Sequence, residues 1–178
     1  MEGRLFLIVG NSGSGKDSII KGLAGLPGVR VAKRFITREP SAFEDNNFIS
    51  LDDFNSMLER NAFLLNWVSY GFNYGVSSEV ISWLNQGYDV IVNVSRDVID
   101  KAKNLYHNTK VIFVKVPVSD SINRIKGRGR EGGAEVEARV NRALNNQDCD
   151  YADYVIDNSG ELSQAVNELK EIIKKEIS

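Results

Sequence analysis

The most constraining feature of this sequence is the octapeptide GNSGSGKD at residues 10–17, which follows an apolar run of five residues. Three glycines allow the backbone to curl so that successive N–H groups point inward, and the positive end of the next helix adds its dipole. Lys16 can then reach the outer phosphates of a nucleoside triphosphate. The pattern predicts a phosphate-binding loop made of Gly10, Asn11, Ser12, Gly13, Ser14, Gly15, Lys16, Asp17 and Ser18.

The alternative is a glycine-rich turn between a strand and a helix that carries an exposed lysine. This interpretation leaves the spacing Gly-x4-Gly-Lys and the buried strand before it unexplained. A strand, a loop and a helix in this order favour a phosphate-binding loop, and therefore a nucleoside triphosphate such as ATP as the ligand.

Asp17 occupies the position where such loops normally offer a Ser or Thr hydroxyl to magnesium. A carboxylate beside a triphosphate repels it unless a cation lies between them, so Asp17 is expected to bind Mg²⁺ directly or through water. The hydroxyl of Ser18 is the substitute ligand. In the alternative interpretation, Asp17 is only an acidic residue in the first helical turn, where it favours the helix dipole.

Composition limits the classes of protein and of partner. A chain of 178 residues with 42% hydrophobic side chains predicts one globular domain, and a net charge of -2 gives no support for a surface that coats nucleic acid. The single cysteine excludes an internal disulfide, and the single histidine excludes a multi-histidine zinc site. The first apolar run is too short for a signal peptide or a membrane span, so we expect a cytoplasmic protein with no membrane partner. No particular oligomeric state is predicted.

Apolar runs alternate with segments of helical periodicity along the chain, which indicates an α/β fold with a mainly parallel sheet. The buried-strand runs are expected at residues 5–9, 90–92 and 111–116, with further strands at 29–31, 63–70 and 154–156. Helices are expected from residue 18 to about 24 and at 51–60, 77–85, 119–126, 134–145 and 162–177. Residues 71–75 are expected to form a turn or loop.

Basic residues gather between positions 124 and 142, on a glycine-punctuated loop and the helix after it. In phosphoryl transfer, arginines that close over the moving group stabilise its charge and expel water. Arg128 on the loop and Arg139 on the helix are the candidates for this catalytic role. The alternative is a solvated helix surface with ion pairs such as Glu135 with Arg139.

A second candidate anion site contains Arg34, Thr37 and Arg38. Two cations four residues apart beside a hydroxyl suit a substrate phosphate held by guanidinium contacts. Tyr74 either adds its hydroxyl to this site or is a packed loop aromatic whose oxygen lies in water.

Several segments resemble the guanylate-kinase-like P-loop kinases. Residues 34–38 are similar to their Ser-x-Thr-Thr-Arg, 48–54 to their Phe-Val-Ser-x-x-x-Phe, 73–75 to their Tyr-Tyr-Gly, 124–129 to their lid, and 153–158 to their last strand and adenine-contacting loop. The resemblance implies a three-layer kinase fold with a core at 1–33 and 89–178. It also implies a substrate-binding insertion at about 34–88, a mobile lid at about 127–135, and nucleotide contacts from Asp157 and Asn158.

The departures from this family concern recognition of the base. Leu65 stands where the guanine-reading carboxylate is expected, Val76 replaces a hydroxyl, and Asn46 replaces a phosphate-binding tyrosine. A site without polar partners discriminates poorly or rejects the base, so guanylate kinase activity is not expected.

A closer resemblance is to one branch of these kinases, the ribose 1,5-bisphosphate phosphokinases. It covers the loop with its Asp17, the segments 34–38, 74–76 and 92–96, and the run 127–131. The resemblance implies transfer of phosphate from ATP to a sugar bisphosphate, with 5-phosphoribosyl 1-diphosphate as the product, in bacterial phosphonate degradation. The alternatives are a nucleoside monophosphate kinase with an altered base pocket and a non-catalytic guanylate-kinase-like binding module.

Overall fold

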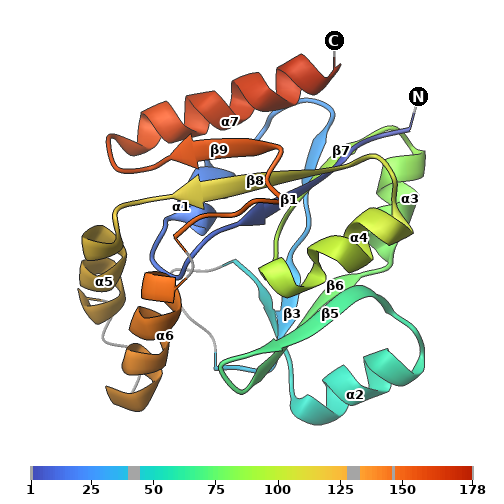
Figure 1. The fold of residues 1–178 in the computed structure, drawn as a ribbon. Coiled ribbons are helices and arrows are strands. Elements are labelled where there is room, and N and C mark those ends of the chain that lie inside the picture. Colours follow the sequence, from blue (N-terminus) through green and yellow to red (C-terminus); the bar gives the residue numbers. More distant parts are fainter. Residues whose placement is uncertain (1, 40–44, 128–132, 146, 178) are drawn as a thin grey trace. The chain divides into compact units, whose positions relative to one another are not determined.

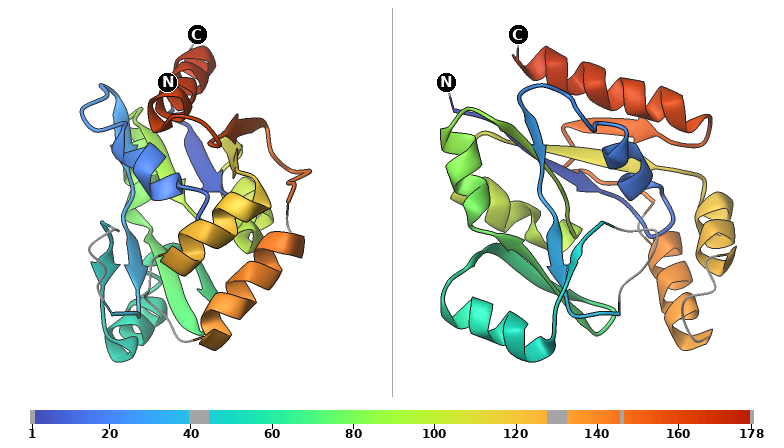
Figure 2. Two further views of the ribbon diagram at one scale, coloured as in Figure 1. Left: turned by 90° about the vertical axis from the view of Figure 1, so that its left-hand side faces the viewer. Right: turned by 180° about the vertical axis from the view of Figure 1, so that it is seen from behind.

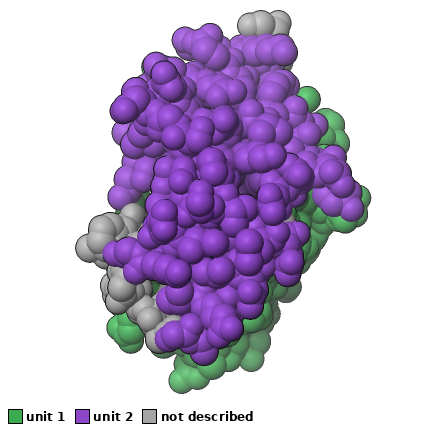
Figure 3. Space-filling model, turned by 60° about the vertical axis from the view of Figure 1, so that its left-hand side comes forward, with its two compact units in different colours: residues 1–7, 26–110 green, residues 8–25, 111–178 purple. Residues whose placement is uncertain are grey.

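The computed structural model describes residues 2–39, 45–127, 133–145 and 147–177 (Figure 1). The chain folds into two compact units, which Figure 3 shows in different colours. Unit 1 comprises Met1–Leu7 and Leu26–Lys110, and unit 2 comprises Ile8–Gly25 and Val111–Ser178. The predicted boundaries of a kinase core, an insertion and a lid stay predictions.

The larger sheet has five strands in the order β2-β7-β1-β8-β9. They are β1 (Leu5–Val9), β2 (Val29–Val31), β7 (Asp89–Asn93), β8 (Thr109–Lys115) and β9 (Tyr154–Asp157). Every residue of β1 and β7 is buried, and the pairs β2–β7 and β8–β9 are parallel. The apolar runs predicted as strands are confirmed, because side chains buried on both faces of a parallel sheet produce such runs.

A second, four-stranded sheet lies within unit 1, in the order β4-β3-β6-β5. Its strands are β3 (Arg34–Ile36), β4 (Asn47–Phe48), β5 (Phe63–Ser69) and β6 (Phe72–Ser77). The helix α2 (Leu51–Glu59) begins where the Ser50 hydroxyl accepts a hydrogen bond of 3.0 Å from the amide of Asp53.

The expected turn or loop at residues 71–75 is wrong, because most of it belongs to strand β6. A β-carbon at Gly75 would lie 2.5 Å from the Phe63 ring, so glycine is needed there for close packing. Asn73 and Gly75, which look like turn residues, therefore form part of a sheet. Ser77 also ends β6 rather than starting the next helix.

Unit 1 contains the further helices α3 (Glu79–Asn85) and α4 (Ile99–Leu105), with a 3₁₀ turn, η1 (Arg96–Val98), before α4. The helices of unit 2 are α1 (Lys16–Lys21), α5 (Val118–Gly127), α6 (Gly133–Asn145) and α7 (Leu162–Ile177). Helices α5 and α6 lie side by side, and α7 lies along β9 (Figures 1 and 2). Within the described ranges, none of the helices has the length and apolar character of a membrane span.

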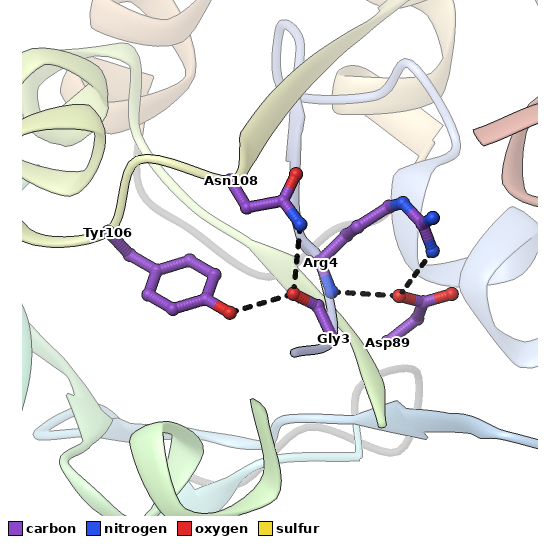
Figure 4. Close-up of polar contacts among 5 residues, drawn as sticks. All are labelled: Gly3, Arg4, Asp89, Tyr106 and Asn108. Carbon is purple, nitrogen blue, oxygen red and sulfur yellow. Dashed lines mark hydrogen bonds and ion pairs between the residues drawn. The ribbon is translucent and has the colours of Figure 1, made fainter. Parts of the chain in front are cut away.

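The start of β1 is fixed by polar contacts within unit 1 (Figure 4). The carbonyl of Gly3 accepts hydrogen bonds from the Tyr106 hydroxyl at 2.7 Å and from Asn108 Nδ2 at 3.2 Å. The buried carboxylate of Asp89 accepts from the backbone amide of Arg4 at 2.8 Å and pairs with its guanidinium at 3.4 Å. Burial, followed by the charges of nearby acids, raises the pKa of the Tyr106 hydroxyl.

We predict that Tyr106→Phe lowers the free energy of unfolding at neutral pH by about 0.5–1.5 kcal/mol, because one buried hydrogen bond is lost. The Gly3 carbonyl still accepts a hydrogen bond from Asn108 in this variant. The folded-state pKa of Tyr106 exceeds the unfolded value of 10.0, so its contribution is complete below that pH and is lost as the pH rises through the folded pKa. Urea unfolding across the alkaline range should therefore show a shallower decline in Tyr106→Phe than in wild type. Tyr151→Phe, at an exposed tyrosine, is the control, and equal slopes for wild type and Tyr106→Phe would contradict this account.

Candidate active site

The loop between β1 and α1 has the backbone conformation that the glycine spacing predicts. Gly13 and Gly15 have φ angles of 81° and 88°, in the left-handed region that side chains disfavour. A β-carbon at Gly13 would lie 2.8 Å from the Ser121 carbonyl oxygen, and one at Gly15 would lie 2.3 Å from Asn158 Nδ2. Glycine at these positions lets the loop pack closely against α5 and the residues after β9.

The ammonium group of Lys16 lies at this loop. Lys16 Nζ donates to the carbonyl oxygens of Gly10 at 2.6 Å and Asn11 at 2.9 Å, and it lies 3.4 Å from Ser14 Oγ. The side chain of Lys16 therefore folds back over the loop that precedes it, where a cation attracts phosphate. Ser14 itself is buried, so its side chain belongs to the packed side of the loop.

Asn158 and Arg124 tie the loop to the rest of unit 2. Asn158 Nδ2 donates a buried hydrogen bond of 2.8 Å to the carbonyl of Ser14. Arg124, on α5, donates to the carbonyls of Gly13 and Asn158, each at 3.3 Å. Arg124 belongs to the predicted basic cluster and to the segment that resembles a lid, but neither predicts this contact, because it joins positions 111 residues apart.

Helix α6 contacts the same loop through two residues one turn apart. Arg139 Nη1 donates to Ser12 Oγ at 3.3 Å, and Asn11 Nδ2 donates to the carbonyl of Ala143 at 3.4 Å. Arg139 is 8% exposed, so the alternative of a solvated helix surface is wrong for this residue. Arg128, the other predicted catalytic arginine, lies outside the described residues.

The predicted magnesium ligands are consecutive residues of α1. Asp17 is half-buried and Ser18 is exposed. Among the described residues, no group of three or more His, Cys, Asp or Glu side chains could hold a metal ion. A single carboxylate beside a phosphate loop fits Mg²⁺, since this ion keeps several waters and usually binds one or two carboxylates together with substrate phosphates.

The two predicted nucleotide contacts after β9 differ in environment. Asp157 is exposed, and its carboxylate accepts a hydrogen bond from the amide of Ser159 at 2.9 Å. Hydrogen bonds from the side chain and backbone of Ser159 lower the pKa of Asp157, so it carries its charge at neutral pH. Asn158 is buried, and its amide is already bonded to the phosphate loop.

The candidate acceptor residues Arg34, Thr37 and Tyr74 belong to unit 1, and Arg34 is only 9% exposed. The Arg34 backbone amide and its Nε both donate to Asn46 Oδ1, each at 3.2 Å. The guanidinium carbon of Arg34 lies 5.8 Å from the centre of the Tyr74 ring. Arg38 is half-buried and lies beyond the end of β3.

Thr37 and Tyr74 both have structural contacts. The Thr37 hydroxyl accepts a hydrogen bond of 2.9 Å from the amide of Asn73, which joins the ends of β3 and β6. Tyr74 is a buried strand residue, and its ring stacks on Trp67 with a centroid distance of 5.4 Å. Tyr74 therefore lies in a strand rather than in a loop, and that part of the alternative is wrong.

Leu65 and Val76, at the two positions where the resemblance places base-reading groups, are partners in the sheet of unit 1. Leu65 on β5 pairs in register with Val76 on β6, and both side chains are fully buried. Their pairing gives this part of the sheet an apolar interior. A polar base edge placed against these side chains would lose hydrogen bonds to water without gaining others.

A glycine loop joins a buried strand to a helix, Lys16 is held at this loop, and arginines of α5 and α6 lie against it. Together these features define a P-loop kinase fold. The guanylate kinase family model matches residues 2–176, and the chain therefore belongs to the guanylate kinase family. It is a phosphotransferase of the guanylate-kinase-like type.

Curated relatives agree with this assignment, and a solved structure shares the fold. The "Ribose 1,5-bisphosphate phosphokinase PhnN" of Thiobacillus denitrificans is 36% identical over 97% of this chain and 93% of that protein. The protein of the same name from Rhodopseudomonas palustris is 35% identical over 97% of this chain and 89% of that protein. The crystal structure of guanylate kinase from Anaplasma phagocytophilum matches with a TM-score of 0.78 at 16% identity, over 98% of this chain and 86% of that chain. The predicted α/β fold with a mainly parallel central sheet is confirmed.

We predict that Asn158→Ala weakens ATP binding, because the Ser14 carbonyl loses its buried donor and the loop loses a tether. The unsatisfied carbonyl costs about 1–3 kcal/mol of folding stability, and the loss of the tether is expected to raise the Kd for ATP. Titration calorimetry with ATP and magnesium measures it. Ser163→Ala, at an exposed residue of α7, is the control, and an unchanged affinity in Asn158→Ala would show that the tether is dispensable.

Proposed function

We propose that this chain transfers the γ-phosphoryl group of ATP to ribose 1,5-bisphosphate and forms 5-phosphoribosyl 1-diphosphate. The names of its relatives support this substrate. The observation that carries the proposal is the buried apolar pair of Leu65 and Val76, which stands where the resemblance places guanine-reading groups. A sugar bisphosphate has no base, so it requires no polar group at these positions.

The acceptor phosphates are assigned to the basic residues of unit 1. Arg34 and Arg38 bind them through guanidinium contacts, which suit phosphate geometry better than a point charge does. Arg34 adds a cation where guanylate kinases have a serine, in keeping with a substrate that carries two phosphates. Thr37 and Tyr74 complete this predicted site.

The reaction needs positioning and charge stabilisation rather than a general base. An oxygen of the 1-phosphate, already anionic at neutral pH, attacks the γ-phosphorus; the new O–P bond forms as the bond to the ADP oxygen breaks. The loop amides and Lys16 hold the ATP phosphates. Arg139 and Arg128 stabilise the charge on the transferring group, with residues 127–135 as a lid.

Magnesium, when bound, supplies positive charge to the outer oxygens of the triphosphate. Asp17 holds the ion directly or through water, with Ser18 as the substitute ligand. Asp157 and Asn158 lie on the predicted adenine side. We further propose that the chain works as a single kinase domain in the cytoplasm, in phosphonate degradation.

Lys16→Ala should lower kcat by about a hundredfold or more while the fold stays intact, because the cation that meets the developing phosphate charge is removed. Turnover with saturating substrates and thermal unfolding test this expectation together. Lys21→Ala, at the exposed end of the same helix, is the matched control and should retain kcat. Turnover of Lys16→Ala at the wild-type rate would remove the phosphate-loop hypothesis.

The substrate assignment is tested by ATP consumption with magnesium, in which ribose 1,5-bisphosphate is compared with GMP and the other nucleoside monophosphates. We expect selective turnover of the sugar bisphosphate, with the product identified by mass. Turnover of a nucleotide alone would establish a nucleoside monophosphate kinase instead. Binding of ATP without turnover of any acceptor would overturn the catalytic proposal in favour of a binding module.

A further inference from the structure

Asn46 lies beside Arg34 because of the pairing of two short strands. The parallel pair β3–β4 places Phe35 opposite Asn47, so the residues that precede them, Arg34 and Asn46, are also neighbours. A short side chain at position 46 can therefore reach both the backbone and the side chain of residue 34. No sequence motif announces this contact, since it depends on the strand register.

One oxygen atom of Asn46 makes both contacts. Asn46 Oδ1 accepts a hydrogen bond from the Arg34 backbone amide and another from Arg34 Nε, each 3.2 Å long. Both partners are donors, so the carbonyl oxygen rather than the amide nitrogen of Asn46 must face them. The side chain of Arg34 is thus bound to the same atom that fixes its own backbone.

These bonds set the plane of the guanidinium group. Arg34 Nε is directed at Asn46, and the group lies over the ring of Tyr74, which is itself stacked on Trp67. A bidentate contact to a phosphate would then use the two Nη atoms, which form the opposite edge of the guanidinium fork. Because an amide is neutral, Asn46 orients Arg34 without adding a negative charge near the bound anion.

We propose that Asn46 is a positioning residue, which holds the Arg34 guanidinium in the orientation that receives a phosphate of the sugar bisphosphate. The inference rests on the proposed function and extends it to a residue that binds no substrate itself. It explains why an asparagine stands where the related kinases have a phosphate-binding tyrosine: the contact to phosphate has passed to Arg34, and position 46 now supports it. If Asn46 had a purely structural role, its hydrogen bonds to Arg34 would only join β3 to β4.

Two substitutions separate these roles. Asn46→Ala removes the acceptor and should raise the KM for ribose 1,5-bisphosphate by about tenfold, the scale of one lost charge-assisted hydrogen bond, while kcat and the KM for ATP change little. Asn46→Asp keeps an oxygen that can accept both bonds but neutralises Arg34, so it should raise the same KM at least as much without lowering the melting temperature. A structural role predicts that Asn46→Asp has a wild-type KM, and that result would overturn the proposal.

Asn47→Asp is the matched control, because it introduces the same charge at the next, exposed residue of β4. It should leave the acceptor KM near the wild-type value, whereas an equal rise would show that any nearby negative charge suffices. In an Arg34→Ala background, Asn46→Ala should cause no further rise in KM, since the group that it positions is gone. Additive effects of the two substitutions would also overturn the proposal.

A binding measurement distinguishes failure of this inference from failure of the proposed function. Inorganic phosphate is titrated into ¹⁵N-labelled protein while the Nε–H signal of Arg34, assigned from Arg34→Lys, is followed by NMR. Wild type should respond and Asn46→Ala should not. If wild type responds but turns over no sugar bisphosphate, only the proposed function fails; if wild type turns over the substrate and the two proteins respond alike, only the positioning role fails.

Discussion

Close packing around the phosphate loop is the constraint on which the candidate ATP site depends. Three glycines of the loop leave room for atoms of other segments, since β-carbons at Gly10, Gly13 and Gly15 would lie 2.5, 2.8 and 2.3 Å from the Val114 carbonyl, the Ser121 carbonyl and the amide of Asn158. Strand β8, helix α5 and the residues after β9 therefore determine the path of the loop. The loop is a product of tertiary packing as much as of its own sequence.

The same packing explains what could be predicted from the sequence. The apolar runs of β1 and β7 predict buried strands because side chains on both faces are covered, and the motif from Gly10 to Lys16 carries its own spacing. Helix α4 has no clear helical period in the sequence, because only Ile99 and Ala102 of its seven residues are buried. The strand β6 resembles a turn because its Gly75 accommodates the ring of Phe63, a requirement that comes from another strand.

The candidate site likewise contains features that the sequence predicts and features that depend on tertiary packing. The loop residues and the arginines could be proposed as phosphate-binding groups from residue type and spacing, since phosphate binding requires cations and glycine. The supporting contacts of Arg124 and Asn46 could not be predicted, because they join segments that only the fold brings together: Arg124 with the loop at Gly13, and Asn46 with Arg34 through the strand register. Sequence patterns thus indicate which groups bind an anion better than which groups hold them in place.

The pairing of Leu65 with Val76 has an evolutionary consequence. A carboxylate introduced at position 65 alone would be buried opposite an isopropyl group, and a hydroxyl introduced at position 76 alone would face an isobutyl group. Each single substitution buries a polar group without a partner and costs stability before any base recognition is gained. A polar group at either position therefore needs a polar partner at the other, so a single substitution in this pair is not enough to create a site that reads a base.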